Sequence, residues 1–154
     1  MADPTIFERL KQDHDQHRQL LVKLADSKDD NDRREKLFGQ FRVEVTAHAA
    51  AEEESLYATM LAMPDLREDA QHSVSEHKEI DDFLDELQEL ELGSDAWEDL
   101  FARMKKRYLH HITEEEEEMF PDAAKELTAD QEAKLAQTFA ERKPDELDRA
   151  EAAE

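Results

Sequence analysis

The chain has 154 residues, of which 42 are acidic and 20 are basic, so its formal net charge at pH 7 is −22. A charge of this sign repels the phosphates of nucleic acids and of anionic membrane surfaces, so we expect neither as a partner. The chain has no cysteine and only 2 glycines, which excludes disulfides and thiolate metal ligands and favours helix throughout.

Apolar residues spaced three and four apart predict four long helices. The first begins near Asp3 or Thr5, and the four cover about 5–26, 33–62, 66–92 and 96–120. Pro64 follows the second helix, and Gly93 suits the C-terminal cap of the third. Pro121 is predicted to end the fourth helix.

Thr128 and Gln131 form a capping pattern that opens a further helix, which we expect to be short and to end near Lys143. The residues after Lys143 are charged and lack an apolar stripe, so they are predicted to fray. Short loops make neighbouring helices antiparallel. The sequence therefore predicts an all-α fold: an up-down-up-down antiparallel four-helix bundle at 1–124, followed by a short C-terminal helix and charged tail at 125–154.

The first residues show no basic segment followed by an apolar run, and no window approaches the roughly 20 apolar residues of a membrane-spanning helix. We therefore expect a cytoplasmic protein without a membrane partner. A single domain of this length can bury a substantial core by itself, so a monomer or a weak homo-oligomer is expected.

One motif occurs twice along the chain. His48 is followed four residues later by Glu52, and His111, which lies 63 residues after His48, is followed four residues later by Glu115. Residues four apart stack on one face of a helix, so each copy points an imidazole and a carboxylate in the same direction. A helix presents two metal ligands in this way.

The same offset relates Asp13-His14 to Glu76-His77, and the apolar stripes of the two halves also match. The chain is therefore interpreted as two copies of one helical hairpin. With antiparallel neighbours, the interior sorts into three layers. One layer holds His14, His48, His77 and His111; a second holds Leu10, Glu52, Ser73 and Glu115; a third, on the other side, holds His17, Val45, Ile80 and Tyr108.

Imidazoles and carboxylates are costly to bury in a core unless a partner compensates them, and a cation supplies that partner. Two divalent ions account for the set economically. In this hypothesis His14 and His48 bind one ion, His77 and His111 bind the other, and Glu52 and Glu115 bridge the two. Nitrogen and oxygen donors without sulfur suit iron or manganese, with zinc also possible.

His17 and Tyr108 share a predicted layer whose other members are apolar, so we expect them to lie near each other. They could be ordinary polar core residues, or one of them could complete the coordination of a metal. Tyr108 beside the metals could also supply a proton or an electron. His72 and His110 fall outside the inward stripes and are expected to be exposed or to lie behind the direct ligands.

These motifs resemble the hemerythrin-like (His-His-Glu cation-binding) family over about residues 6–121. The resemblance rests on Asp13-His14, on His48 to Glu52, on Glu76-His77, and on His111 to Glu115 followed by Met119-Phe120-Pro121. It implies a non-haem di-iron centre inside an up-down-up-down bundle, bridged by two carboxylates and an oxo or hydroxo group. Oxygen-carrying members have a further histidine where this chain has Ser73, and place the last carboxylate at the position of Glu116 instead of Glu115.

The resemblance favours a di-iron protein that reacts with dioxygen, peroxide or nitric oxide. The departure at Ser73 favours catalase-like or peroxidase-like turnover over reversible oxygen carriage. Two alternatives stay open from the sequence. One is an iron or oxygen sensing or storage protein that acts through a partner, and the other is a bundle that binds zinc without redox chemistry.

Overall fold

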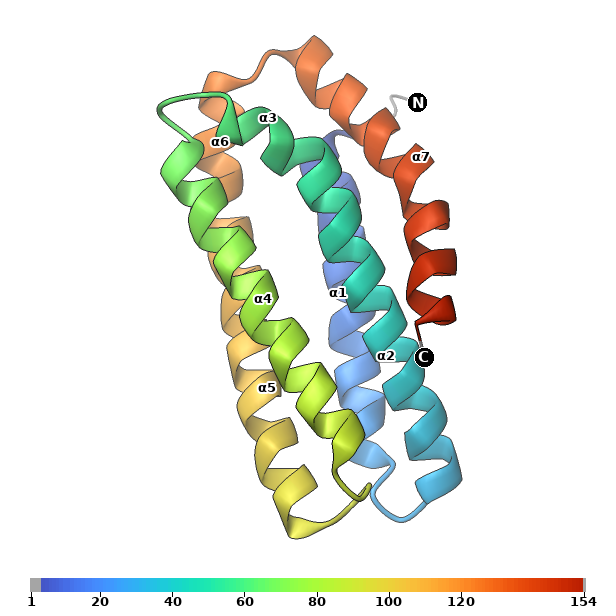
Figure 1. The fold of residues 1–154 in the computed structure, drawn as a ribbon. Coiled ribbons are helices and arrows are strands. Elements are labelled where there is room, and N and C mark those ends of the chain that lie inside the picture. Colours follow the sequence, from blue (N-terminus) through green and yellow to red (C-terminus); the bar gives the residue numbers. More distant parts are fainter. Residues whose placement is uncertain (1–3, 154) are drawn as a thin grey trace.

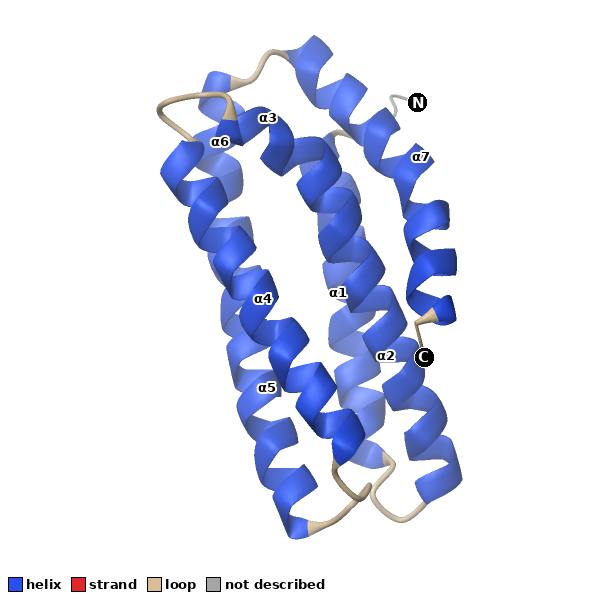
Figure 2. Ribbon diagram, in the orientation of Figure 1, coloured by secondary structure: helices blue, strands red, loops and turns tan. Residues whose placement is uncertain are grey.

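The computed structural model describes residues 4–153, and every regular element in that range is a helix (Figures 1 and 2). The elements are α1 (Ile6–Asp26), α2 (Asn31–Glu52), the π-helix η1 (Glu53–Tyr57), α3 (Ala58–Leu61), α4 (Arg67–Glu89), α5 (Asp95–Glu114), the π-helix η2 (Glu115–Met119), α6 (Phe120–Glu126) and α7 (Ala129–Ala152). The predicted all-α class is confirmed.

The helices form a bundle in which α1 packs against α2 and α4 packs against α5 (Figure 1). The segments α2, η1 and α3 follow one another without a break and form one rod, and α5, η2 and α6 form another. Helix α7 lies along α2 and α1 and covers one side of the bundle. The termini of the described chain lie on that side in Figure 1.

Side-chain caps fix where the helices begin. Thr5 and Glu8 form a capping box, so α1 begins directly after the predicted start at Thr5, while the alternative start at Asp3 lies outside the described residues. Ser94 caps α5 by accepting from the backbone N–H of Trp97. Gly93 has a φ of 81°, a conformation that side chains with a Cβ rarely adopt, so glycine suits this turn.

Two apolar clusters flank a band of buried polar residues. One cluster packs Leu21 and Leu24 of α1 against Phe41 of α2 and against α4 and α5. The other gathers the start of α1, the end of the α2 rod, α6 and α7, with Phe120 and Phe139 among its members. Because the polar band lies between two dry clusters, water is kept from it at both ends of the bundle.

Two predicted helix ends are wrong. The helix does not stop at Pro121, because the wide turn of η2 shifts the hydrogen-bond register directly before it and Pro121 falls in the first turn of α6. Helix α7 is not short either, since it continues through Pro144 to Ala152. The carbonyl of Ala150 accepts a hydrogen bond from buried Arg42, so packing against α2 outweighs the proline penalty.

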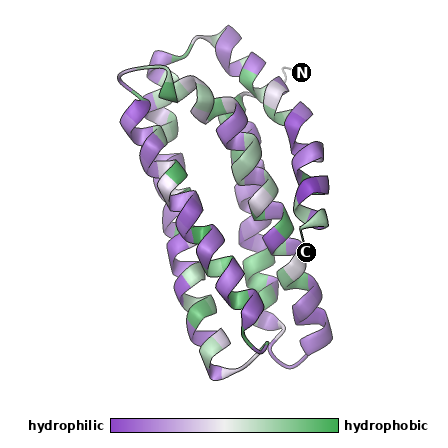
Figure 3. Cartoon of the chain, in the orientation of Figure 1, coloured by the Kyte–Doolittle hydropathy of each residue, from purple (hydrophilic) through white to green (hydrophobic). Residues whose placement is uncertain are grey.

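Hydrophilic residues are spread along every helix, with apolar residues between them (Figure 3). This pattern matches helices that each bury one face and expose the other. No helix in the described range combines the length and apolar character required to cross a membrane.

Candidate metal centre

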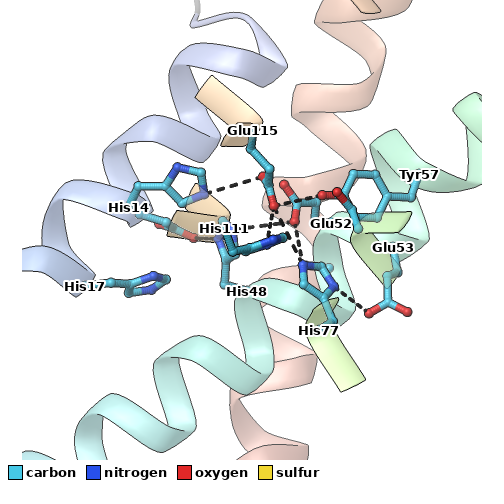
Figure 4. A network of polar contacts seen from close by, with 12 residues as sticks. His14, His17, His48, Glu52, Glu53, Tyr57, His77, His111 and Glu115 are labelled. Carbon is cyan, nitrogen blue, oxygen red and sulfur yellow. Dashed lines mark hydrogen bonds and ion pairs between the residues drawn. The ribbon is translucent and has the colours of Figure 1, made fainter. Parts of the chain in front are cut away.

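The polar band between the two apolar clusters contains histidines and glutamates from four different helices (Figure 4). These residues are His14 and His17 of α1, His48 and Glu52 of α2, His77 of α4, His111 of α5, and Glu115 at the start of η2. Each is at most 7% exposed. The structure therefore brings together all six residues that the sequence predicted as metal ligands.

A π-turn adjoins or begins at the inward carboxylate in each half of the chain. Glu52 is the last residue of α2 before η1, and Glu115 is the first residue of η2. In each turn a backbone N–H bonds five residues back, from Ala58 to the carbonyl of Glu53 and from Phe120 to that of Glu115. π-turns often occur at functional sites, because the added residue changes the face that the following side chains present.

Each of the four histidines at the predicted ligand level places Nδ1 against a carboxylate. The pairs are His48 with Asp13 at 2.8 Å, His111 with Glu76 at 2.9 Å, His14 with Glu116 at 2.7 Å and His77 with Glu53 at 3.0 Å. The 63-residue offset relates the first pair to the second and the third to the fourth. A neutral imidazole that donates from Nδ1 presents the lone pair of Nε2 on its other side, which is the arrangement that metal-binding histidines adopt.

The inward Nε2 atoms face the carboxylates of Glu52 and Glu115. His77 Nε2 lies 3.2 Å from Glu52 Oε1, and His111 Nε2 lies 2.5 Å from Glu115 Oε1. On the other side, His14 Nε2 lies 3.7 Å from Glu115 Oε2 and His48 Nε2 lies 3.8 Å from Glu52 Oε1. Both carboxylates thus lie between the two pairs of imidazoles.

Several of these inward atoms are buried and have no hydrogen-bond partner among residues 4–153. They are Nε2 of His14 and His48, both carboxylate oxygens of Glu52, and Oε2 of Glu115. Buried polar atoms are almost always satisfied, so such a concentration of them in one place requires an explanation. A cation between these imidazole nitrogens and carboxylate oxygens would satisfy both.

The donors fall into two groups whose ligand atoms lie within 4.8 Å of one another. One group is Glu52, His77, His111 and Glu115, and the other is His14, His48 and Glu52. Nitrogen and oxygen donors of this kind fit two divalent transition-metal ions. This grouping agrees with the predicted pairing of the histidines, while coordination itself stays a prediction.

Burial and proximity shift the pKa values of the two inward carboxyls in opposite directions. Burial, reinforced by the negative charge of Glu115, raises the pKa of Glu52 to about 8. Burial also acts to raise the pKa of Glu115, but the charge and hydrogen bonds of His111 and His77 outweigh it and hold that pKa well below its usual range. Glu52 therefore holds a proton while Glu115 is charged, so the two close carboxyl groups are not both negative.

The histidines of the two halves also differ. Burial acts to lower the pKa of His111, but Glu115 and Glu76 outweigh it and raise that pKa to about 9. The pKa of His77 is raised well above its usual range by its bonds to carboxylates, which outweigh burial. For His48 burial prevails over the hydrogen bond to Asp13, so its pKa falls to about 4.

These pKa directions predict that metal binding depends on pH. Glu52, His77 and His111 hold protons near neutral pH in the metal-free protein, and a metal must displace them to bind. The apparent affinity should therefore rise as the pH is raised from about 6 to about 9, with protons released on binding. Calorimetric titration with zinc in buffers of different ionisation enthalpy would count those protons, and a pH-independent affinity would contradict this charge assignment.

His17 and Tyr108 contact each other, as the sequence predicted. His17 Nδ1 lies 2.5 Å from the Tyr108 hydroxyl, and both side chains are buried. Burial lowers the pKa of His17 and raises that of Tyr108, so the imidazole is neutral and the phenol keeps its proton. The ring of His17 lies 5.2 Å from that of His48 between centroids, which places the pair beside the candidate ligands.

Tyr57 is a site residue that the sequence prediction missed. Its hydroxyl donates to Glu115 Oε1 at 2.8 Å, and its ring stacks on that of His77. At the equivalent place in the other half, the ring of Phe120 stacks on that of His14. The aromatic position of the repeated motif was visible in the sequence, but an ideal α-helical period turns Tyr57 away from the site, and only the π-turn brings it in.

Two residues that the family resemblance singled out lie outside the inward group. Glu116 bonds the outer nitrogen of His14 and also Arg18, so it supports His14 from behind instead of joining Glu52 and Glu115. Ser73 is buried and donates to the sulfur of Met119 at 3.5 Å. The positions behind the histidines could have been found in the sequence, since Asp13 and Glu76 are related by the same offset as the histidines they support.

The sequence of the chain matches a known protein family. A model of the hemerythrin HHE cation binding domain matches residues 5–123. A Nostoc protein described as a DNA nickase is 26% identical over 137 residues, which cover 89% of this chain and 38% of that protein. The chain therefore spans well under half the length of this relative.

A solved structure shares the fold. It is the crystal structure of a hemerythrin HHE cation binding domain-containing protein from Mycobacterium kansasii, with a TM-score of 0.82 and 22% sequence identity. The match covers 96% of this chain and 90% of that one. With the family model matched over α1 to α6 and a His/Glu cluster at the centre of the bundle, the chain belongs to the hemerythrin HHE cation-binding domain family.

Proposed function

We propose that this protein is a non-haem di-iron protein that reacts with peroxide, dioxygen or nitric oxide, with catalase-like or peroxidase-like turnover favoured over reversible oxygen carriage. The observation that carries the proposal is the group of unsatisfied Nε2 and carboxylate atoms at the centre of the bundle. His14 and His48 would hold one ion, His77 and His111 the other, and Glu52 and Glu115 both. Iron there would supply a change of redox state and a position for a small oxidant.

The surrounding residues keep the site dry and oriented. Carboxylates fix the histidine rings through Nδ1, and Tyr57 holds one oxygen of Glu115. A cavity of about 10 Å³ touches His48, His77, His111 and Tyr108, which is room for roughly one water-sized molecule. A space of this size would not admit a bulky organic substrate.

The chemistry is tested with iron-loaded protein. We expect near-ultraviolet absorption and consumption of hydrogen peroxide, measured as oxygen evolution or as oxidation of an added reductant. Reversible spectral change with dioxygen alone, without peroxide consumption, would instead indicate carriage. Metal analysis of protein purified from iron-fed cells tests the zinc alternative, because zinc protein would be colourless and inert to peroxide.

Tyr108 is expected to contribute to turnover through its proton. Replacing Tyr108 by phenylalanine removes the hydroxyl bonded to His17 and should lower peroxide turnover by about 100-fold, as loss of a general acid does, while both metals stay bound. The matched comparison is Tyr57→Phe, another buried phenol beside the site. If only Tyr57→Phe slows turnover, the proton role belongs to Tyr57 and the proposal for Tyr108 is wrong.

An iron or oxygen sensing or storage role is the second candidate. It is favoured if the loaded centre binds a small ligand without turnover. The description of the Nostoc relative as a DNA nickase concerns a much longer protein. The net charge of −22 on this chain opposes contact with DNA phosphates, so we do not extend that activity to it.

A further inference from the structure

Helices α4 and α5 carry a second pair of His-x-x-x-Glu motifs on their outer side. On α4, His72 precedes Glu76 by four residues, and on α5 His110 precedes Glu114 by four. Helix α5 therefore presents two such motifs in adjacent registers, an inward one from His111 and an outward one from His110. The outward spacing offers the same ligand geometry as the buried centre, but towards solvent.

The outward side chains converge. His72 Nε2 lies 3.2 Å from Glu114 Oε1 and 3.5 Å from Glu76 Oε2, while His110 Nε2 lies 3.2 Å from the other oxygen of Glu114. Ligand atoms of His72, Glu76 and Glu114 all lie within 4.8 Å of one another. The side chains of His72 and Glu114 are 54% and 27% exposed, so an ion from solution can reach them.

The duplicated fold does not impose this cluster. The 63-residue offset places Arg9, Ala47 and Ala51 where the second half has His72, His110 and Glu114. In the first half the carboxylate behind the histidine, Asp13, is held by the cations of Arg9 and Lys143 at 2.6 and 2.9 Å. In the second half, His72 takes the place of Arg9, and the cation beside the equivalent carboxylate, Glu76, is Arg107.

Glu76 connects this outer cluster to the buried centre. It is 2% exposed, and its Oε1 accepts from Nδ1 of His111 at 2.9 Å. Its Oε2 is buried on the side of His72 and accepts no hydrogen bond from residues 4–153, although Arg107 Nη2 lies 2.9 Å away as an ion pair. Arg107 also binds Glu79 through two hydrogen bonds, so it keeps a partner if a metal ion takes its place at Glu76.

The local charge also favours a cation. Burial raises the pKa of Asp69, and the charges of Asp122, Glu68 and Glu114 raise it further, which shows how crowded the carboxylates are around His72. Acidic residues alone do not select a transition metal. The imidazole of His72 supplies that selectivity, because nitrogen donors favour first-row transition ions over magnesium or calcium.

We propose that His72, Glu76 and Glu114, with His110 beside them, form a second, solvent-facing site for one divalent first-row transition-metal ion. Glu76 shares one oxygen with this ion and the other with His111 of the buried centre. The outer site is therefore coupled to the inner one through a single carboxylate.

Zinc binding to the 154-residue chain tests the proposal. Metal already carried by the purified protein is counted first, and zinc is then added by equilibrium dialysis and counted by metal analysis. We expect His72→Gln and Glu114→Gln each to lose one equivalent of zinc relative to the unsubstituted protein, with at least about 10-fold weaker binding at that site. Because the difference is taken between variants, the result does not depend on which metal occupies the buried centre.

Glu117→Gln is the matched control. Glu117 is an exposed member of the same acidic run, and its substitution removes the same charge as Glu114→Gln does. It should keep the full complement of zinc. If it lowers zinc binding as much as Glu114→Gln does, the ion is held only by the acidic surface and the proposal is overturned. Equal stoichiometry in the unsubstituted protein and in His72→Gln would overturn it as well, whether or not the buried centre proves to contain iron.

Discussion

Replacing Glu115 by alanine should reduce the metal bound by the buried centre from two ions per chain to at most one. Glu115 faces His111 through one oxygen and His14 through the other, at 2.5 and 3.7 Å, so its loss removes a ligand from both ions. We expect metal affinity to fall by more than about 100-fold. Removing a residue that only supports a ligand typically costs about 10- to 100-fold, and Glu115 is proposed as a direct ligand. Metal analysis after dialysis gives the stoichiometry.

Glu118→Ala is the control for this experiment, since Glu118 lies in the same acidic run but is exposed. It should keep both ions. Circular dichroism would confirm that the Glu115 variant remains helical. Full two-metal occupancy in folded Glu115→Ala protein would show that this carboxylate does not serve the ions.

Removing the metals from the unsubstituted protein should lower its melting temperature by more than about 10 °C. An ion held at roughly 1,000 times its dissociation constant adds about 4 kcal/mol to the free energy of unfolding, and each kcal/mol is worth about 2–4 °C in a chain of this size. Without the ions, unsatisfied nitrogen and oxygen atoms face one another in the core. Thermal unfolding before and after chelation measures the effect.

The Glu115→Ala protein provides the comparison for the melting experiment. Because it should hold little metal, chelation should change its melting temperature much less. If chelation leaves the melting temperature of the unsubstituted protein unchanged after metal loss has been verified, the ions are not bound in the interior.

The layer that contains the histidines could be predicted from the sequence, because helical period and a 63-residue offset are both global features of the chain. The same reasoning placed His17 beside Tyr108, and the structure confirms that contact. Short loops make neighbouring helices antiparallel, and antiparallel packing determines which residues lie at the same height along the bundle. No local detail of the turns was required for this.

Features that depend on departures from regular helix could not be predicted in this way. The π-turn after Glu52 rotates the side chain of Tyr57 towards the site. A regular α-helical period does not predict that rotation. Helix α7 was predicted to end near Lys143, because the residues after it are charged and lack an apolar stripe. Its continuation depends on tertiary contacts, including the ion pair between Lys143 and Asp13 across the fold.

We propose that two ions lie between the four histidines, bridged by Glu52 and Glu115. Anomalous X-ray scattering, recorded on both sides of the iron absorption edge from crystals of protein purified from iron-fed cells, would locate them. We predict two iron peaks, one between His14 and His48 and one between His77 and His111, each within bonding distance of both carboxylates. A single peak, no peak in the interior, or iron found only at His72 and Glu114 on the surface would contradict the claim.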